Sequence, residues 1–291
     1  MRVLVFGETG QVALALKRLT QAAPRGRYQP VFLPRAHADL MDPAACARAI
    51  RATRPEAVIN AAAYTAVDAA ESDETAASVV NGAAPAAMAQ TCAAQGIPLV
   101  HISTDYVFDG TGNTPFTPDH PTAPINAYGR SKLTGEEGVI TAQGIHAVLR
   151  TSWVVSGDGA NFIKTMCRLG ATRDTLSVVA DQIGGPTPAE AIAAACLSIA
   201  EQLRETPKKS GVYHLSGTPD TSWADFARAI MQAAALPCTV TEIPSSAYPT
   251  PAPRPLNSRL DCRSLAETFG IPRPDWRAAL PQIIADLKAK G

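Results

Sequence analysis

The sequence feature that most constrains this chain is a glycine turn between an apolar run and a helical pattern. Val3–Phe6 is predicted to be a buried strand, Gly7-Glu8-Thr9-Gly10 the turn, and Gln11–Ala22 a helix. Glycines let a backbone turn tightly and approach a pyrophosphate, and the amino end of a helix attracts negative charge. The G-x-x-G-x-x-A spacing, with Ala13 as the last small residue, therefore favours a dinucleotide site over a plain strand–helix connection.

The alternation of apolar runs and helical patterns continues through the first half of the chain. Further strands are predicted at Val31–Leu33, Ala57–Asn60, Leu99–Ser103 and Ala147–Leu149. Continuous apolar strands separated by helices are typical of a parallel sheet that is covered on both faces. The pattern predicts an α/β fold with a Rossmann-type, doubly wound parallel sheet.

The pattern changes after about Arg150. Val212–Leu215 is predicted to return to the sheet as a strand, whereas Pro244–Pro255 holds five prolines and is not suited to a sheet centre. We interpret that stretch as a loop that crosses a smaller C-terminal lobe. The expected organisation is a dinucleotide-binding domain over residues 1–150 with a return segment at about 186–217, and a substrate-binding lobe formed by residues 151–185 and 218–291.

Composition argues against several classes of partner. Lys and Arg number 26, as do Asp and Glu, so charge gives no reason to expect a nucleic acid or an anionic membrane. No apolar run approaches the roughly 18 residues of a membrane helix, and the start lacks the pattern of a signal peptide. The six cysteines are widely spaced, and none of the five histidines forms a zinc-type spacing. We expect reduced, buried thiols and a cytoplasmic protein.

The end of the second predicted strand bears on the choice of cofactor. A site for NAD commonly has an acid there that binds the ribose hydroxyls, but this strand ends Leu33-Pro34-Arg35. Arg35 would suit the 2′-phosphate of NADPH, and it would equally suit a solvated surface position. The sequence leaves NADPH and NADH both open.

A tyrosine and a lysine share one face of a later helical segment, Tyr128-Gly129-Arg130-Ser131-Lys132. A free phenol is a poor acid–base group at neutral pH, and a neighbouring ammonium is expected to lower the phenol's pKa toward a useful range. The pair would then exchange a proton with a carbonyl oxygen. A surface pair without function is the alternative, because chance gives this spacing in about one chain of this composition in seven.

Hydroxyl groups stand at the end of another predicted strand. Leu99–Ser103 runs into the polar residues Thr104, Asp105 and Tyr106. Ligands of open parallel sheets bind at the carboxyl ends of the strands. Ser103 or Thr104 is therefore expected to offer a hydroxyl to the same carbonyl oxygen, unless it only caps the turn.

The glycine turn, the strand-end hydroxyl and Tyr-x-x-x-Lys, in this order, resemble the extended short-chain dehydrogenase/reductase family. Longer segments resemble one branch of it, the dTDP-4-dehydrorhamnose reductases, and the likeness covers essentially the whole chain. These segments are Asn60–Asp68, Ser103–Gly110, Asp181-Gln182 with Pro186-Thr187, and Arg254-Pro255 with Ser258 and Leu260-Asp261. The resemblance implies reduction of dTDP-4-dehydro-L-rhamnose to dTDP-L-rhamnose by hydride transfer from NADPH or NADH, in dTDP-rhamnose biosynthesis.

The resemblance also implies roles for the matching residues. Tyr128 would be the proton donor, Lys132 its partner and a ligand of the cofactor ribose, and Thr104 the hydroxyl that tunes Tyr128. The residues implied in substrate binding are Thr104, Asp105, Tyr106 and Trp153, although Trp153 would also suit a core. The residues implied in cofactor binding, besides Tyr128 and Lys132, are Gly7, Gly10, Gln11, Val12, Asp39, Leu40, Ala61, Ala62, Ala63, Tyr64 and Thr65.

A metal ion is a doubtful addition. Some members of the family form a dimer bridged by Mg²⁺ between carboxylates. Glu190 matches one of those carboxylates, but Ala15 stands where such members carry an acid. Glu190 is therefore a weak candidate, and we expect a monomer or homodimer that binds a small sugar nucleotide.

Other functions stay open at this point. Another sugar-nucleotide reductase or a 4-epimerase would share the fold. A dehydratase needs a further acid beside Asp105, and no glutamate follows it. A non-catalytic regulatory subunit, of which the family has an example, would be expected to lack Tyr128 or Lys132, and both are present.

Overall fold

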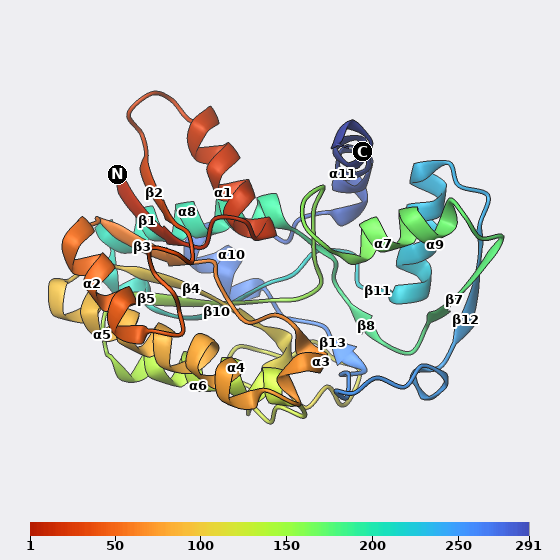
Figure 1. Ribbon diagram of the computed structural model, residues 1–291, viewed down its shortest axis with the longest axis horizontal. Helices are drawn as coiled ribbons and strands as arrows, with labels where there is room; N and C mark the ends of the chain where they lie inside the picture. Colours follow the sequence, from red (N-terminus) through yellow and green to blue (C-terminus); the bar gives the residue numbers. More distant parts are fainter. Residues whose placement is uncertain (291) are drawn as a thin grey trace.

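The computed structural model describes residues 1–290, and a six-stranded parallel sheet lies at its centre (Figure 1). The strands are β1 (Arg2–Phe6), β2 (Gln29–Leu33), β3 (Ala57–Asn60), β4 (Leu99–Thr104), β5 (His146–Thr151) and β10 (Gly211–Leu215). Their spatial order is β10-β5-β4-β3-β1-β2, and every pair is parallel. The predicted fold class is confirmed, and the predicted strands match within two residues at each end.

Helices cover both faces of this sheet, because alternate residues of a strand point to opposite sides. Val5 and Ile59 pack in one core against α1 (Gln11–Ala22) and α8 (Ala189–Glu205). Leu4 and Phe6 pack in another core, on which lie α2 (Pro43–Thr53), α5 (Ala84–Gln95) and α6 (Ala127–Thr141). Burial on both faces explains why the strands are almost continuously apolar.

The strand order creates a switch point between β1 and β3, because the chain runs from β1 to β2 on one side and then crosses to β3 on the other. Open parallel sheets bind ligands in the crevice that such a reversal leaves at the carboxyl ends of the strands. Backbone hydrogen bonds join the three strand ends there: Gly7 N donates to Leu33 O at 3.1 Å, and Ala61 N donates to Phe6 O at 3.0 Å.

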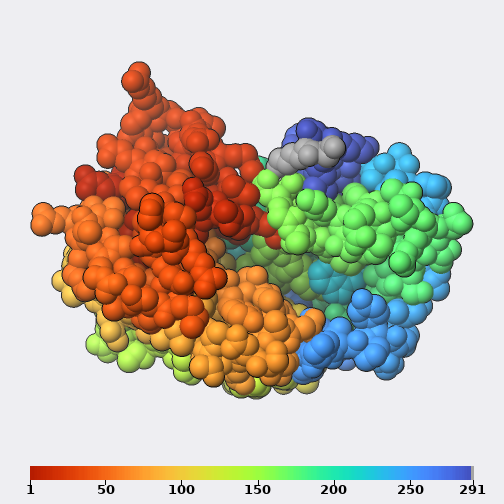
Figure 2. Space-filling view, viewed as in Figure 1, coloured from red at the N-terminus to blue at the C-terminus, as the bar shows by residue number. Residues whose placement is uncertain are grey.

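Apart from the cores on the two faces of the sheet, a separate hydrophobic core lies beside the sheet and is called the second core. It is built by α7 (Phe162–Gly170), α9 (Trp223–Ala234) and α11 (Trp276–Lys290), with β7 (Thr175–Val179) paired in parallel to β12 (Thr239–Ile243). Phe226 and Trp276 are fully buried in it, with ring centroids 5.0 Å apart. The surface is hollowed between the N-terminal segments, in red and orange, and the later segments, in green and blue (Figure 2).

Short elements lie between the longer helices and strands. They are α3 (Val67–Ala70), α4 (Glu74–Ser78), the π-helical turn η1 (Val79–Ala83), the 3₁₀ turns η2 (Asp105–Val107), η3 (Pro207–Lys209) and η4 (Ser245–Ala247), and the strands β6 (Val154–Val155), β8 (Ile183–Gly184), β9 (Thr187–Pro188), β11 (Thr221–Ser222) and β13 (Asn257–Ser258). Pro244–Pro255 is a loop apart from η4, as predicted. The helix α10 (Arg263–Phe269) packs on the main sheet, although it comes from the segment expected in the smaller lobe. Across residues 1–290, no helix has the length and apolar character to cross a membrane.

Glycines allow α6 to lie close to η1 and α5. A Cβ on Gly138 would come within 2.6 Å of the Cβ of Ala86, and a Cβ on Gly135 would overlap the carbonyl oxygen of Asn81. The position of α6 over the sheet is therefore set by backbone contacts rather than by adaptable side chains.

This close approach gives a prediction about stability. In a free helix, Gly→Ala stabilises by about 1 kcal/mol. We expect Gly135→Ala to destabilise instead, by roughly 1–3 kcal/mol, because α6 must move away from Asn81. Chemical denaturation measures the difference. The exposed neighbour Glu137 provides a control, since Glu137→Ala should change the free energy of unfolding by less than about 0.5 kcal/mol. A stabilised Gly135→Ala variant would contradict the prediction.

Candidate active site

The glycine turn leaves the amino end of α1 open. Gly7 has φ +105°, and a Cβ on it would lie 3.3 Å from the carbonyl oxygen of Ala61. Gly10 precedes α1 in an extended conformation, and within residues 1–290 no side chain caps the helix. The amide groups of Gln11 and Val12 therefore stand in the partial positive charge of the helix dipole, an arrangement that binds phosphate. The side chain of Val12 belongs to the core, so its contribution to a ligand would come from its backbone.

The loop after β3 lies beside the glycine turn and holds the candidate residues Ala61, Ala62, Ala63, Tyr64 and Thr65. Asn81, from η1, fixes this loop through both backbone groups of Tyr64. Its Oδ1 accepts from Tyr64 N at 2.8 Å, and its Nδ2 donates to Tyr64 O at 3.0 Å. The sequence pattern did not predict this role for Asn81, because a polar side chain in a helical segment has no distinctive spacing.

The side chain of Gln11 connects the start of α1 to the segment that leaves the sheet after β5. Its Oε1 accepts hydrogen bonds from Ser156 Oγ at 2.8 Å and from Asn161 Nδ2 at 3.1 Å. Its Nε2 donates to Val154 O at 3.4 Å. The backbone of Gln11 thus faces the phosphate site while its side chain holds the neighbouring segment.

Tyr128 and Thr104 meet at the carboxyl end of β4. Asn126 caps α6, since its Oδ1 accepts from Gly129 N at 2.8 Å, and this cap places Tyr128 in the first turn. The hydroxyl of Thr104 lies close enough to that of Tyr128 to influence its pKa. Ser103 takes a different partner, because its hydroxyl donates to Glu136 Oε1 at 2.5 Å. The structure therefore pairs Thr104, and not Ser103, with the tyrosine.

The expectation that Lys132 lowers the pKa of Tyr128 is wrong for this structure. Burial raises the pKa of Tyr128 to about 12. The neighbouring Thr104 hydroxyl opposes this rise, and the negative charge of Asp105 adds to it. Lys132 is buried, and its Nζ donates to Ile102 O at 2.7 Å. Burial also lowers the pKa of Lys132 to about 8. The phenol is therefore protonated at neutral pH, which is the state that a proton donor needs.

Asp105 is a buried carboxyl group with one oxygen free. Its Oδ1 accepts from Thr104 Oγ1 at 3.1 Å, whereas Oδ2 has no hydrogen-bond partner in the described part of the chain. Burial raises the pKa of Asp105 to about 6, against the effect of the neighbouring hydroxyls of Ser258 and Thr104. Tyr106 packs edge-on against Tyr128, with ring centroids 5.5 Å apart. These groups form one polar cluster beside the tyrosine hydroxyl.

Trp153 follows β5 in a left-handed conformation, with φ +46°. Its indole stacks on that of Trp223 with centroids 3.5 Å apart, and a Cβ on Gly184 would come within 2.8 Å of it. Trp223 in turn donates to Gln182 Oε1 at 3.1 Å. The sequence did not predict the partnership with Trp223, because the two tryptophans are 70 residues apart in the chain.

The proline-rich loop is fastened close to these groups. Arg254 forms an ion pair with Asp68 at 2.8 Å, and Asp68 Oδ1 also accepts from Ala252 N at 3.1 Å. Asn126, the cap of α6, donates to Pro253 O at 2.9 Å. Asn126 therefore bonds both to the proline-rich loop and to the first turn of α6, the helix that carries Tyr128.

The remaining candidates lie outside this cluster. Arg35 is largely exposed after β2, and its Nε donates to Asp39 Oδ2 at 3.1 Å. The hydrogen bond from Met41 N, followed by that from Arg35, lowers the pKa of Asp39. Leu40 is part of the core beneath. Glu190 is paired with Arg18 at 3.2 Å, and the described residues hold no cluster of three metal-binding side chains.

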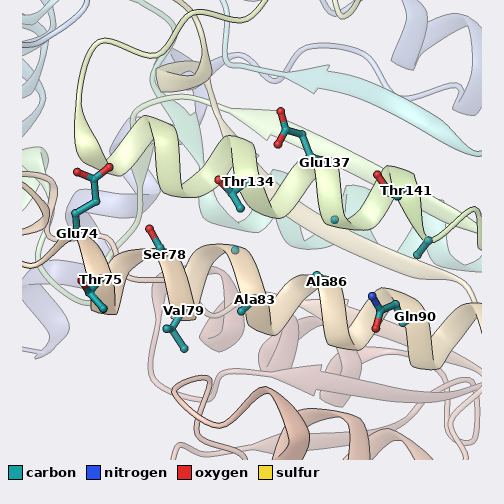
Figure 3. Close-up of a pocket in the computed structure, with 13 residues that line it drawn as sticks. Glu74, Thr75, Ser78, Val79, Ala83, Ala86, Gln90, Thr134, Glu137 and Thr141 are labelled. Atoms are coloured by element: carbon teal, nitrogen blue, oxygen red, sulfur yellow. The ribbon is translucent and has the colours of Figure 1, made fainter.

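A separate surface hollow lies between α6 and the α4–η1–α5 segment (Figure 3). Its lining includes Ser78, Ala83, Gln90, Thr134 and Glu137. None of these is a candidate site residue, so the hollow and the polar cluster are distinct features.

The comparisons with known proteins identify the family of the chain. The family model of the RmlD substrate binding domain matches residues 1–289. A dTDP-4-dehydrorhamnose reductase of Burkholderia thailandensis is 46% identical over 99% of this chain and 99% of its own length. The chain belongs to the dTDP-4-dehydrorhamnose reductase family.

Solved structures of dTDP-4-dehydrorhamnose reductases share the fold over nearly their whole length. The protein from Clostridium acetobutylicum superposes with a TM-score of 0.92 at 33% identity, covering 99% of this chain and 100% of that one. The protein from Bacillus anthracis, solved in complex with NADP, has a TM-score of 0.88 at 32% identity, covering 98% and 99%.

The raised pKa of Asp105 predicts a stabilising substitution. The pKa of Asp105 is about 6 in the folded protein and 3.8 when the group is free. As pH rises from about 4 to 6, the carboxyl ionises in the unfolded chain but stays protonated in the folded one, so the folded state loses stability over this range. Asp105→Asn keeps the acceptor for Thr104 and removes the buried charge. We expect it to be more stable than the parent at about pH 8, by up to roughly 3 kcal/mol, with the difference fading below about pH 4. Denaturant titrations at both pH values measure this, and equal stability at the higher pH would contradict it.

Proposed function

We propose that this chain reduces the C4 keto group of dTDP-4-dehydro-L-rhamnose to give dTDP-L-rhamnose, with NADPH or NADH as reductant. The observation that carries the proposal is the approach of Tyr128 to Thr104 at the carboxyl end of β4, beside the phosphate-binding geometry of α1. Membership of the reductase family supports the substrate.

The residues around the switch point fit a dinucleotide. The cradle at Gly7 admits close backbone approach, and the open amino end of α1, at Gly10, Gln11 and Val12, suits a pyrophosphate. Residues 61–65 would line the ribose beside the nicotinamide, and Asp39 and Leu40 the adenosine end. The bound cofactor would supply the hydride that reduces the sugar carbon.

Tyr128 would transfer its proton to the sugar oxygen. Its pKa of about 12 keeps the phenol protonated at neutral pH, so the proton is available when charge develops on the carbonyl oxygen. Thr104 would orient the phenol, which lies close to its hydroxyl. Lys132, whose Nζ donates to Ile102 O, would serve the cofactor ribose.

The sugar nucleotide would bind against the second lobe. The unpartnered Oδ2 of Asp105 is a buried acceptor that suits a sugar hydroxyl, and Tyr106 and Trp153 would flank the ring. In this proposal residues 1–150 and about 186–217 bind the cofactor, and residues 151–185 and 218–291 bind the substrate, apart from α10.

The proposal also covers the localisation, oligomeric state and partners of the protein. We expect a cytoplasmic enzyme that acts as a monomer or homodimer and has no nucleic-acid partner. All six cysteines are free, which suits a reducing compartment.

The direct test is a spectrophotometric assay. The purified chain is mixed with NADPH or NADH and freshly prepared dTDP-4-dehydro-L-rhamnose, and the absorbance of the reduced nicotinamide is followed. Consumption that requires the sugar, with dTDP-L-rhamnose as product, supports the proposal. Cofactor that stays reduced would reject it and favour another sugar-nucleotide activity or a regulatory subunit.

Arg35 gives a prediction about cofactor choice. If its guanidinium leaves Asp39 to meet the 2′-phosphate, Arg35→Ala should raise the KM for NADPH by roughly 10-fold, the value of one charge-assisted contact, and leave that for NADH nearly unchanged. Arg48 is a matched control, because it is also exposed and paired with an aspartate, Asp42. Steady-state kinetics with both cofactors decide the matter, and equal effects on the two would remove Arg35 from the site.

Tyr128 gives a prediction about catalysis. Tyr128→Phe keeps the ring and removes the proton, so kcat should fall by roughly 10²- to 10⁴-fold while the fold and cofactor binding survive. Circular dichroism and NADPH fluorescence provide the controls. Near-normal turnover would mean that the proton comes from another group.

Two further variants divide the roles around Tyr128. Thr104→Val should lower kcat with little change in cofactor affinity, because Thr104 contacts the reacting end only. Lys132→Met should lower both, because Lys132 is proposed to bind the cofactor ribose and so to hold the nicotinamide beside the sugar. Identical kinetic profiles for the two variants would contradict this division.

A further inference from the structure

One face of α6 lies against three successive residues at the end of β4. Tyr128, Lys132 and Glu136 are spaced four residues apart and so share that face. Lys132 Nζ donates to Ile102 O at 2.7 Å, Ser103 Oγ donates to Glu136 Oε1 at 2.5 Å, and the Tyr128 side chain lies close to Thr104. Lys132, Tyr128 and Thr104 are proposed to contact the cofactor or the substrate. Glu136 and Ser103 are not among the proposed ligand contacts.

Glu136 is held from two strands at once. Its side chain is 1% exposed, and Arg150 of β5 is 5% exposed. Arg150 Nη2 donates to Glu136 Oε2 at 2.6 Å, and Arg150 Nε donates to Oε1 at 3.0 Å, so the pair is bidentate. With the Ser103 bond, the carboxylate joins α6 to both β4 and β5. Such a charge-assisted, bidentate contact fixes geometry as well as adding energy.

Glu136 also carries the negative charge that acts on the pKa of Lys132. Burial lowers the pKa of Lys132, and Glu136 on the same helix opposes this change. On β4, His101 is buried, and both its burial and the charge of Lys132 lower the pKa of the imidazole, so His101 is neutral. Arg150 on β5 is tied to Glu136, and Tyr128 is uncharged at neutral pH. Asp105, on η2, has its Oδ1 directed to Thr104.

We propose that Glu136 is a positioning residue, which sets α6 on β4 through Ser103 and on β5 through Arg150. Because Glu136 lies one helical turn from Lys132 on the same face, its charge also favours the protonated ammonium. This inference rests on the proposed function for its kinetic consequence. It concerns a carboxylate that lies outside the ligand-contacting set and acts through Thr104, Tyr128 and Lys132.

The Ser103 bond is tested by Ser103→Ala, which leaves the ion pair of Glu136 with Arg150 in place. We expect kcat to fall roughly 10- to 100-fold, because Thr104 and Tyr128 lose their fixed separation, while the KM for the sugar nucleotide changes by less than about 3-fold. Thr91→Val is the matched control. Thr91 is a buried hydroxyl on α5 that bonds only to Ala87 O of its own helix. A Ser103→Ala enzyme with the same kcat as Thr91→Val would overturn the positioning role.

The charge of Glu136 is tested by Glu136→Gln, which keeps an acceptor for Arg150. The dissociation constant of NADPH, measured by fluorescence across the pH range, needs no substrate. Loss of the carboxylate favours neutral Lys132, so the pH at which affinity declines on the alkaline side should move down by roughly one unit. An unchanged midpoint in a folded variant would overturn the electrostatic role. Should Glu136→Gln not fold, the Ser103→Ala kinetics still decide the positioning role.

The two readouts separate this inference from the proposed function. A parent protein that binds NADPH but does not reduce the sugar rejects the function, while the pH dependence of NADPH binding still tests Glu136. A parent that reduces the sugar, with both variants at parental kcat and an unshifted midpoint, rejects the inference and leaves the function standing.

Discussion

The contact between α6 and the end of β4 is the interaction on which the site depends. Thr104 and Asp105 are positioned by the sheet, and Tyr128 and Lys132 by the helix, so the reacting geometry exists only where these two elements are held at a fixed separation. The chain achieves this with glycines that let backbone meet backbone, at Gly135 and Gly138, and with polar bonds to successive strand residues. Neither element alone carries a site.

Several of these polar groups lower the stability of the fold. A carboxyl with a free oxygen at Asp105, an ammonium at Lys132 and a phenol at Tyr128 are all withdrawn from water, and their shifted pKa values express that cost. Buried groups that are incompletely bonded are common where a ligand completes the bonding. The large apolar cores on both faces of the sheet offset this cost.

Much of the fold could be predicted from the sequence, because it depends on local patterns. Apolar runs, helical spacing and the glycine turn are encoded by neighbours in the chain, and the strands were placed within two residues. The rule that ligands bind at strand ends predicted a hydroxyl from Ser103 or Thr104 beside Tyr128, and the structure leaves Thr104 for this role, since Ser103 bonds to Glu136.

The features that could not be predicted depend on tertiary contacts. The spacing of Tyr128 and Lys132 indicated a lowered phenol pKa, but burial dominates, and the ammonium bonds to a carbonyl of β4 instead. The contacts of Asn81 with Tyr64 and of Trp153 with Trp223 join residues far apart in the chain. Periodicity carries no information about such contacts, whereas the packing of η1 and of the second core determines them.

The side chain of Gln11 makes the two halves of the molecule energetically interdependent. Its backbone belongs to the phosphate-binding turn, while its amide is shared among Val154, Ser156 and Asn161 at the root of the second core. A ligand that displaces α1 must strain or break those three bonds, so occupancy of one half changes the conformational freedom of the other. By thermodynamic linkage the effect is mutual: whatever the first ligand does to the affinity for the second, the second does equally to the first.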